Sequence, residues 1–109
     1  MAGVQEMSKV LEDSRKFATA ALDVVPGAEV WLYGSYAKGC PRPGSDIDIA
    51  VVVPDGYYTD PDAWLADNKR LWEIAWDINE IIEPNLRIDS PDLMRFVELA
   101  VRGKGIRLA

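Results

Sequence analysis

The stretch YGSYAKGCPRPGSDIDIAVVV, residues 33–53, decides how this chain folds. Its last part, IDIAVVV at residues 47–53, is too apolar for a strand with one face in water, so it predicts a buried central strand. The run EVWLY at residues 29–33 predicts a second buried strand. Residues 34–46 contain three glycines and two prolines. This composition predicts one helical turn after Gly34-Ser35, followed by a loop.

Two helices are expected on either side of this stretch. Apolar residues recur at helical spacing over residues 4–25, and this helix is expected to end before Pro26. A second helix is expected over residues 62–78. It begins with Asp60 as the N-cap and Pro61 at the first helical position, where a missing N–H costs no hydrogen bond.

The C-terminal part predicts two further strands and one helix. Residues 81–88 predict a strand at a sheet edge or with a bulge, because Pro84 cannot donate to a strand ladder. A last helix begins at residues 90–92 and stops at Gly103. Residues 106–108 predict a short final strand. Helices and strands therefore alternate, which predicts an α/β (α+β) domain with a small mixed sheet and helices packed against it.

Composition restricts the possible functions. The chain has 109 residues, no histidine and one cysteine. No imidazole is present as a general base, so hydrolase mechanisms that pair Ser or Cys with His are excluded. A zinc site of mixed Cys and His ligands is excluded as well. Residues 1–109 are expected to form a single domain.

Charge and hydropathy restrict the partners. The net charge is −6, and residues 54–83, with eight acidic and two basic residues, account for all of it. Such a domain would repel a polyphosphate backbone, so nucleic acid is not expected as the main partner. No apolar stretch approaches the roughly 20 residues of a membrane span, and the N-terminus lacks the pattern of a secretory signal. We therefore expect a cytoplasmic protein.

Asp46 and Asp48 are candidates for a metal site. They are separated by one residue at the start of an apolar strand, so their side chains share a face and lie about 6.6 Å apart. Two such carboxylates repel each other unless a cation lies between them. Hard oxygen ligands suit Mg²⁺, which completes its shell with water and phosphate oxygens. Two exposed acids at a strand end are the alternative.

Gly34 and Ser35 are candidates for a phosphate site. They follow the first strand and open a helical turn, where backbone N–H groups attract an anion. Glycine allows a phosphate to approach the backbone closely, and serine adds a hydroxyl donor. A tight strand-to-helix turn is the alternative. If the two strands are neighbours, the anion and metal sites lie side by side.

Residues 33–53 resemble the signature of the nucleotidyltransferase superfamily related to DNA polymerase β. The resemblance consists of Gly-Ser followed about ten residues later by an Asp-x-Asp with apolar flanks. In length and order of elements the chain resembles the minimal nucleotidyltransferases of the antitoxin type, which are single-domain proteins often encoded beside a helical partner.

This resemblance implies a role for each matching position. Gly34 and Ser35 would hold the triphosphate of ATP, and Asp46 and Asp48 would bind two Mg²⁺ ions. Two further residues, Lys38 and Ser45, would lie near the phosphates, although a surface lysine and a turn serine are equally open readings.

The family also uses a third carboxylate on a later strand to bind metal and activate the attacking hydroxyl. Glu80, Glu83 and Asp89 all lie near the expected place. We choose Glu83, because it stands at even spacing from Ile81 on the expected strand, just before Pro84. A rim acid without a catalytic role is the alternative for Glu83.

The resemblance implies a Mg²⁺-dependent enzyme that moves a nucleoside monophosphate, AMP from ATP, to a hydroxyl. The acceptor would be a tyrosine of the helical partner, a toxin to which this chain is the antitoxin. Alternatives are a catalytically weak module that binds nucleotide and partner, and transfer to a small molecule such as an aminoglycoside. The helix over residues 62–78 carries Trp64, Trp72 and Trp76 near one stripe, and we expect some of them to be exposed and to contact a partner chain. Homo- and hetero-oligomers both remain open.

Overall fold

The computed structural model describes residues 4–90 and 96–109. Its elements follow in the order α1 (Met7–Val24), β1 (Glu29–Tyr33), α2 (Gly34–Ala37), β2 (Ile47–Pro54), α3 (Pro61–Ile78), β3 (Ile82–Asp89), η1 (Phe96–Arg102) and β4 (Ile106–Arg107). The alternation expected from the sequence is confirmed, with ends that differ by a few residues. No helix in the described ranges is long and apolar enough to cross a membrane.

The last helix differs in type from the expectation. In its described part it is a π-helix, in which each N–H bonds to the carbonyl five residues earlier. The Gly103 N–H donates to the Glu98 oxygen at 2.8 Å, which continues this pattern beyond Arg102. Most of its predicted start at residues 90–92 lies outside the described residues.

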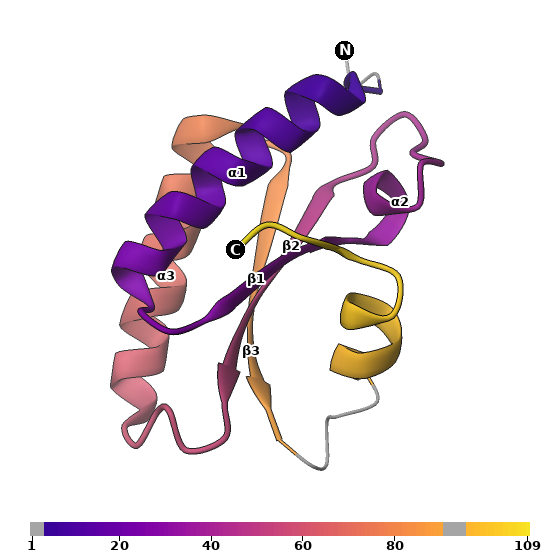
Figure 1. Ribbon diagram of the computed structural model, residues 1–109. Coiled ribbons are helices and arrows are strands. Elements are labelled where there is room, and N and C mark those ends of the chain that lie inside the picture. Colours follow the sequence, from indigo (N-terminus) through magenta and orange to yellow (C-terminus); the bar gives the residue numbers. More distant parts are fainter. Residues whose placement is uncertain (1–3, 91–95) are drawn as a thin grey trace.

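The four strands form one mixed sheet in the order β3-β2-β1-β4. β1 is antiparallel to both β2 and β4, whereas β2 and β3 are parallel. The two strands expected to be central, β1 and β2, are the inner pair (Figure 1). The position of β3 at an edge, expected from Pro84, is confirmed as well.

Pro84 is tolerated because its backbone faces away from β2. The Ile47 N–H donates to the Ile81 oxygen at 2.8 Å, so the backbone of residue 81 faces β2. Successive residues of a strand direct their N–H and C=O groups to alternate sides. The position of Pro84 therefore faces outward, where its missing N–H removes no hydrogen bond from the sheet.

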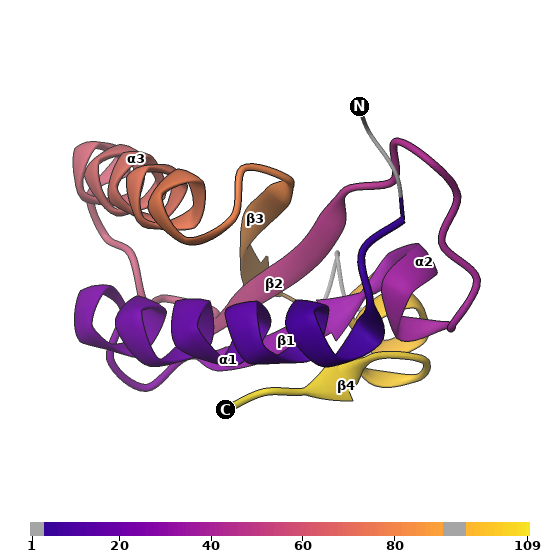
Figure 2. The same cartoon turned by 90° about the horizontal axis from the view of Figure 1, so that it is seen from above.

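The sheet separates two layers of unequal size. α1 and α3 cover one face, and η1 lies on the other, as Figures 1 and 2 show from two directions. The larger core lies beneath α1 and α3 and includes Val10, Phe17, Leu32, Ile47, Ile49, Val51, Val53, Leu71 and Ile82. The smaller core, beneath η1, consists of Ala50, Val52, Val97 and Val101. The face toward η1 is the one that carries polar side chains.

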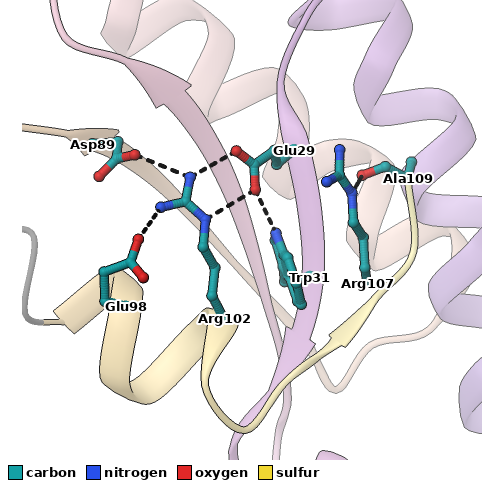
Figure 3. A network of polar contacts seen from close by, with 7 residues as sticks. All are labelled: Glu29, Trp31, Asp89, Glu98, Arg102, Arg107 and Ala109. Carbon is teal, nitrogen blue, oxygen red and sulfur yellow. Dashed lines mark hydrogen bonds and ion pairs between the residues drawn. The ribbon is translucent and has the colours of Figure 1, made fainter.

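Arg102 fixes η1 against this polar face. Its guanidinium lies 2.7 Å from Glu29 Oε2, 3.0 Å from Asp89 Oδ2 and 2.6 Å from Glu98 Oε1 (Figure 3). Glu29 also accepts a hydrogen bond from the Trp31 indole N–H at 2.9 Å. The hydrogen bond with Glu29 is the main cause that raises the pKa of Arg102. A planar fork of five donors suits this cluster better than a lysine would.

Candidate active site

Three side chains from three strands form one row across the sheet. Tyr33 of β1 is the partner of Asp48 in β2, and Asp48 is the partner of Glu83 in β3. Side chains at directly paired positions lie on the same face of a sheet. This face is the one toward η1, because the neighbouring positions Ile47 and Ile49 point into the larger core. The row thus joins Asp48 with Glu83.

The carboxylates of this row repel one another. Burial, followed by the negative charges of Glu83 and Asp46, raises the pKa of Asp48 to about 6. A hydrogen bond with Asp46, burial and the charge of Asp46 raise the pKa of Glu83. Each shift favours the protonated form, because burial and the neighbouring acids both disfavour a charged carboxylate. This concentration of negative charge would be relieved by a cation.

Gly34 is packed directly against Asp48. Its φ of +78° lies in the left-handed region, and a Cβ built on it would collide with Asp48 Oδ2. No other residue type fits this position, because any side chain would need both a strained backbone and the space that the carboxylate fills. The Gly-Ser turn and the Asp-x-Asp segment, distant in sequence, are therefore in contact.

Tyr33 and Asn85 complete the site, and sequence reasoning assigned neither of them a role. Asn85 Nδ2 donates to the Tyr33 hydroxyl oxygen at 2.6 Å. Burial, followed by the charge of Asp48, raises the pKa of Tyr33 to about 12, so its hydroxyl keeps its proton. Asn85 stands two residues after Glu83. This period-two spacing was the available signal that both side chains share a face.

The remaining predicted phosphate residues lie around Gly34. Ser35 is half-buried in α2, and Lys38 is exposed at the end of the same single turn. Ser45 closes a turn in which its N–H donates to the Arg42 oxygen at 2.9 Å. Its hydroxyl accepts from the Arg42 N–H at 3.0 Å. Contact of these three residues with nucleotide stays a prediction.

The other candidates for the third carboxylate lie elsewhere. Glu80 is exposed in the turn before β3. Asp89 is bound to Arg102 at the far end of β3. Of the three acids, only Glu83 is paired with Asp48.

Two tyrosines after β2 lie away from the carboxylates. The hydroxyl of Tyr57 donates to the Pro26 oxygen at 3.1 Å, and that of Tyr58 donates to Asp67 Oδ2 at 2.8 Å. Both follow the C-terminal end of β2, whereas Asp46 and Asp48 lie at its N-terminal end. Tyr57 thus binds the turn before β1, and Tyr58 binds α3.

The carboxylates fit a divalent cation by their chemistry. Asp46, Asp48 and Glu83 supply only hard oxygen donors, which Mg²⁺ prefers. Burial and the neighbouring acids raise the pKa of Asp48 and of Glu83, so a cation would stabilise their charged forms. Within residues 4–90 and 96–109, no three His, Cys, Asp or Glu side chains are already arranged as a metal site. The fit therefore rests on donor type and electrostatics.

Comparison with known proteins identifies the family. Residues 14–96, most of the chain, match the family described as nucleotidyltransferase domain. The chain belongs to this family. It is also 32% identical over 77 residues to the poly(A) polymerase pla1 of Schizosaccharomyces pombe, an alignment that covers 66% of the chain. The chain spans only 13% of that relative.

Solved structures share the fold of this nucleotidyltransferase domain. A candidate nucleotidyltransferase from Sulfolobus solfataricus superimposes with a TM-score of 0.62 at 16% identity, over 93% of this chain and 80% of that one. A toxin-antitoxin complex with AMP-PNP superimposes with a TM-score of 0.54 at 26% identity, over 87% of this chain and 72% of that one. A mutant of the toxin-antitoxin complex MntA-HpeT gives 0.53 at 24% identity, with the same coverage. The fold expected from the sequence is confirmed.

The contact between Gly34 and Asp48 predicts a difference between two glycine substitutions. Gly34→Ala and Gly39→Ala both place an alanine in the left-handed region, at φ of +78° and +74°, but only the first adds a steric clash. We expect Gly39→Ala to lower the free energy of unfolding by about 1 kcal/mol. Gly34→Ala should lower it by at least about 2 kcal/mol more, measured by urea denaturation. Equal losses would contradict the contact.

The raised pKa of Asp48 predicts a pH-dependent cost to stability. Because its folded-state pKa of about 6 exceeds its unfolded value, the cost is present above pH 6 and vanishes as the pH falls below about 4. In metal-free protein, Asp48→Asn should therefore increase the free energy of unfolding by about 1 kcal/mol at pH 7.5, after allowance for solvent screening. The gain should disappear near pH 4.

Denaturation in the presence of a chelator at both pH values measures this effect. Asp55→Asn is the matched control, because Asp55 is exposed in the turn after β2. It should change stability at neither pH. A gain from Asp48→Asn that is the same at pH 4 and pH 7.5 would contradict the prediction.

Proposed function

We propose that this nucleotidyltransferase domain transfers AMP from ATP to a hydroxyl group with the help of two Mg²⁺ ions. The observation that carries the proposal is the row of Asp48 and Glu83 with Gly34 packed against it. Anion and cation ligands thereby meet at the start of one strand. The relative named poly(A) polymerase and the neighbour with AMP-PNP support an adenine nucleotide.

Asp46, Asp48 and Glu83 would hold the metal ions. When bound, Mg²⁺ neutralises charge on the phosphates and stabilises the attacking and leaving oxygens. Gly34 and Ser35 would bind and orient the triphosphate beside Asp48. Lys38 and Ser45 would lie close to its phosphates. Positioning of this kind supplies a large share of the rate in phosphoryl-transfer enzymes.

The transfer itself exchanges one bond at the α-phosphorus. The acceptor hydroxyl oxygen forms a bond to the α-phosphorus, and the bond from that phosphorus to the oxygen bridging to the β-phosphate breaks. Pyrophosphate leaves, and the hydroxyl proton passes to the carboxylate of Glu83. Glu83 suits this step because it lies opposite Asp48 in the paired strands and its carboxylate can accept a proton.

We further propose that the acceptor is a tyrosine hydroxyl of a helical partner protein and that the pair is a toxin-antitoxin system. Two structural neighbours are toxin-antitoxin complexes. The net charge of −6 disfavours an RNA acceptor, whose phosphates this surface would repel. A module that only binds nucleotide and partner would share the surface but would form no AMP.

The outer side of α3 has the features of a partner surface. Trp76 and Leu65 are 62% and 56% exposed. They are eleven residues apart, which is about three helical turns, so both side chains lie on one face of α3. The Trp76 ring packs edge-on against Trp72 at 5.8 Å. Exposed acids of the same segment, namely Asp60, Asp62, Glu73 and Asp77, outnumber its two exposed bases, Lys69 and Arg70. A partner with an apolar face and basic flanks would match both features.

The role of Glu83 predicts a loss of chemistry without a loss of binding. Glu83→Gln removes the proton acceptor at nearly constant volume, so AMP formation from ATP and Mg²⁺ should fall at least 100-fold. With water as the acceptor, chromatography of AMP measures this without knowledge of the partner. The affinity for ATP with Mg²⁺, measured by calorimetry, should change less than tenfold.

Glu80→Gln is the matched control for this experiment. Glu80 is exposed and lies outside the row, so both AMP formation and binding should match the wild type. If Glu80→Gln abolishes AMP formation and Glu83→Gln does not, the assignment of the third carboxylate is wrong. Binding of ATP that is independent of Mg²⁺ and survives the Asp46→Ala, Asp48→Ala double substitution would contradict the proposed function.

The partner surface predicts which apolar side chains matter for assembly. Leu65→Ala and Trp76→Ala should each weaken the complex with the helical protein encoded by the adjacent gene at least tenfold. Leu99→Ala is the matched control, because Leu99 is 67% exposed on η1, across the sheet from α3. Calorimetry measures each dissociation constant. If Leu99→Ala weakens the complex and the other two do not, the partner binds the opposite layer.

A further inference from the structure

A cavity of about 270 Å³ lies between α2 and the C-terminal segment, next to the carboxylates. It is lined by Tyr33, Gly34, Lys38, Leu99, Ala100 and Lys104. Gly34 forms part of its wall and also touches Asp48. The cavity is therefore adjacent to the row of Asp48 and Glu83, and whatever occupies it lies beside that row.

The charged side chains of this cavity are two lysines from distant parts of the sequence. Lys38 ends α2, and Lys104 follows η1. Across the described ranges, neither forms an ion pair, whereas Lys9, Lys16 and Arg102 are each paired with a carboxylate. In a chain with a net charge of −6, two lysines without carboxylate partners that border one cavity create a local site for an anion.

The backbone that carries Lys104 is held firmly in place. The Gly105 N–H donates to the Val101 oxygen at 2.7 Å. A Cβ on Gly105 would lie 2.8 Å from the Leu32 oxygen, and one on Gly103 would lie 2.9 Å from the Glu98 oxygen. Only glycines allow the chain to pass so close to β1 and η1, and Lys104 stands between them.

The network of Arg102 fixes the same segment from the other side. Arg102 binds carboxylates of β1 and β3 as well as one of η1 (Figure 3). It lies two residues before Lys104. The position of Lys104 beside Gly34 thus follows from contacts with β1, β3 and η1, and only its side chain is left to adapt to a ligand.

We propose that this cavity binds the terminal phosphates of the nucleoside triphosphate and that Lys104 is one of the residues that hold them. The inference rests on the proposed function and adds a ligand from outside the Gly-Ser and Asp-x-Asp segments. An ammonium group is a point charge on a flexible stem, which suits the oxygens of a polyphosphate. It also stabilises the negative charge that develops on the leaving pyrophosphate.

The lining favours phosphates over the nucleoside. The two ammonium groups are donors only, and they offer no acceptor to the amino group of adenine. The Tyr33 hydroxyl is already engaged with Asn85. Leu99 and Ala100 add apolar surface to the lining but no hydrogen-bonding side chain.

The test compares Lys104→Gln with Lys69→Gln, which removes the same charge from an exposed position on α3. Calorimetry in the presence of Mg²⁺ would use three probes: ATP, tripolyphosphate and AMP. Lys104→Gln should weaken the binding of ATP and of tripolyphosphate about tenfold, and the binding of AMP less than twofold. Lys69→Gln should match the wild type for all three, and Lys104→Arg should retain most of the affinity.

Each outcome decides a separate question. If the wild type binds no ATP in the presence of Mg²⁺, the proposed function fails, and this inference fails with it. If the wild type binds ATP, and Lys104→Gln binds tripolyphosphate as tightly as the wild type does, only the inference is overturned. A loss of AMP affinity as large as the loss of ATP affinity would assign the cavity to the nucleoside and also overturn it. Thermal unfolding checks that Lys104→Gln is folded. If Lys104→Gln is unfolded, Lys104→Arg tests whether a positive charge at this position is enough for phosphate binding.

Discussion

The structure depends on the register of β2 with its two neighbours. The pairing with β1 and β3 sets Asp48 between Tyr33 and Glu83, and a slip by one residue would turn every side chain of β2 to the other face. Burial of Ile47, Ile49, Val51 and Val53 contributes about 1.5–3 kcal/mol for each side chain as an upper estimate. This total of about 6–12 kcal/mol exceeds the cost of about 1 kcal/mol for a crowded carboxylate. The apolar side of the strand therefore holds the repelling acids together on the other side.

The polar side of the sheet needs a different kind of attachment. Among the described residues, the smaller core beneath η1 consists of Ala50, Val52, Val97 and Val101, with Trp31 and Tyr33 partly buried against it. Apolar burial by these residues is therefore smaller than beneath α1 and α3. Arg102 compensates through charge-assisted hydrogen bonds to three carboxylates, each stronger than a neutral hydrogen bond. The layer that covers the candidate active site is thus attached mainly by polar contacts, which leaves its charged groups close to the carboxylates.

Local sequence signals predicted most of the fold and the centre of the site. The apolar run at residues 47–53, the helical spacing of α1 and the position of Pro84 each act within one element, and each prediction is confirmed. The contacts of the site depend on pairing between elements. The parallel pairing of β3 with β2 sets Glu83 opposite Asp48, and no pattern within residues 81–88 distinguishes it from the alternatives. Lys104 is separated from Gly34 by 70 positions, and only the tight turn between Gly103 and Gly105 brings it to the same cavity.

The edge of β3 connects the proposed partner surface with the candidate active site. α3 and the row of Asp48 and Glu83 lie on opposite faces of the sheet, so a partner bound to α3 has to reach around this edge. A cavity of about 300 Å³ crosses it, lined by Trp64 and Trp72 of α3 and by Pro84, Asn85 and Arg87 of β3. Asn85 lines this cavity and is also part of the candidate active site, because its side chain donates a hydrogen bond to the Tyr33 hydroxyl. Since Pro84 offers no outward N–H to a further strand, this position disfavours the addition of a strand at the edge that the proposed partner has to pass.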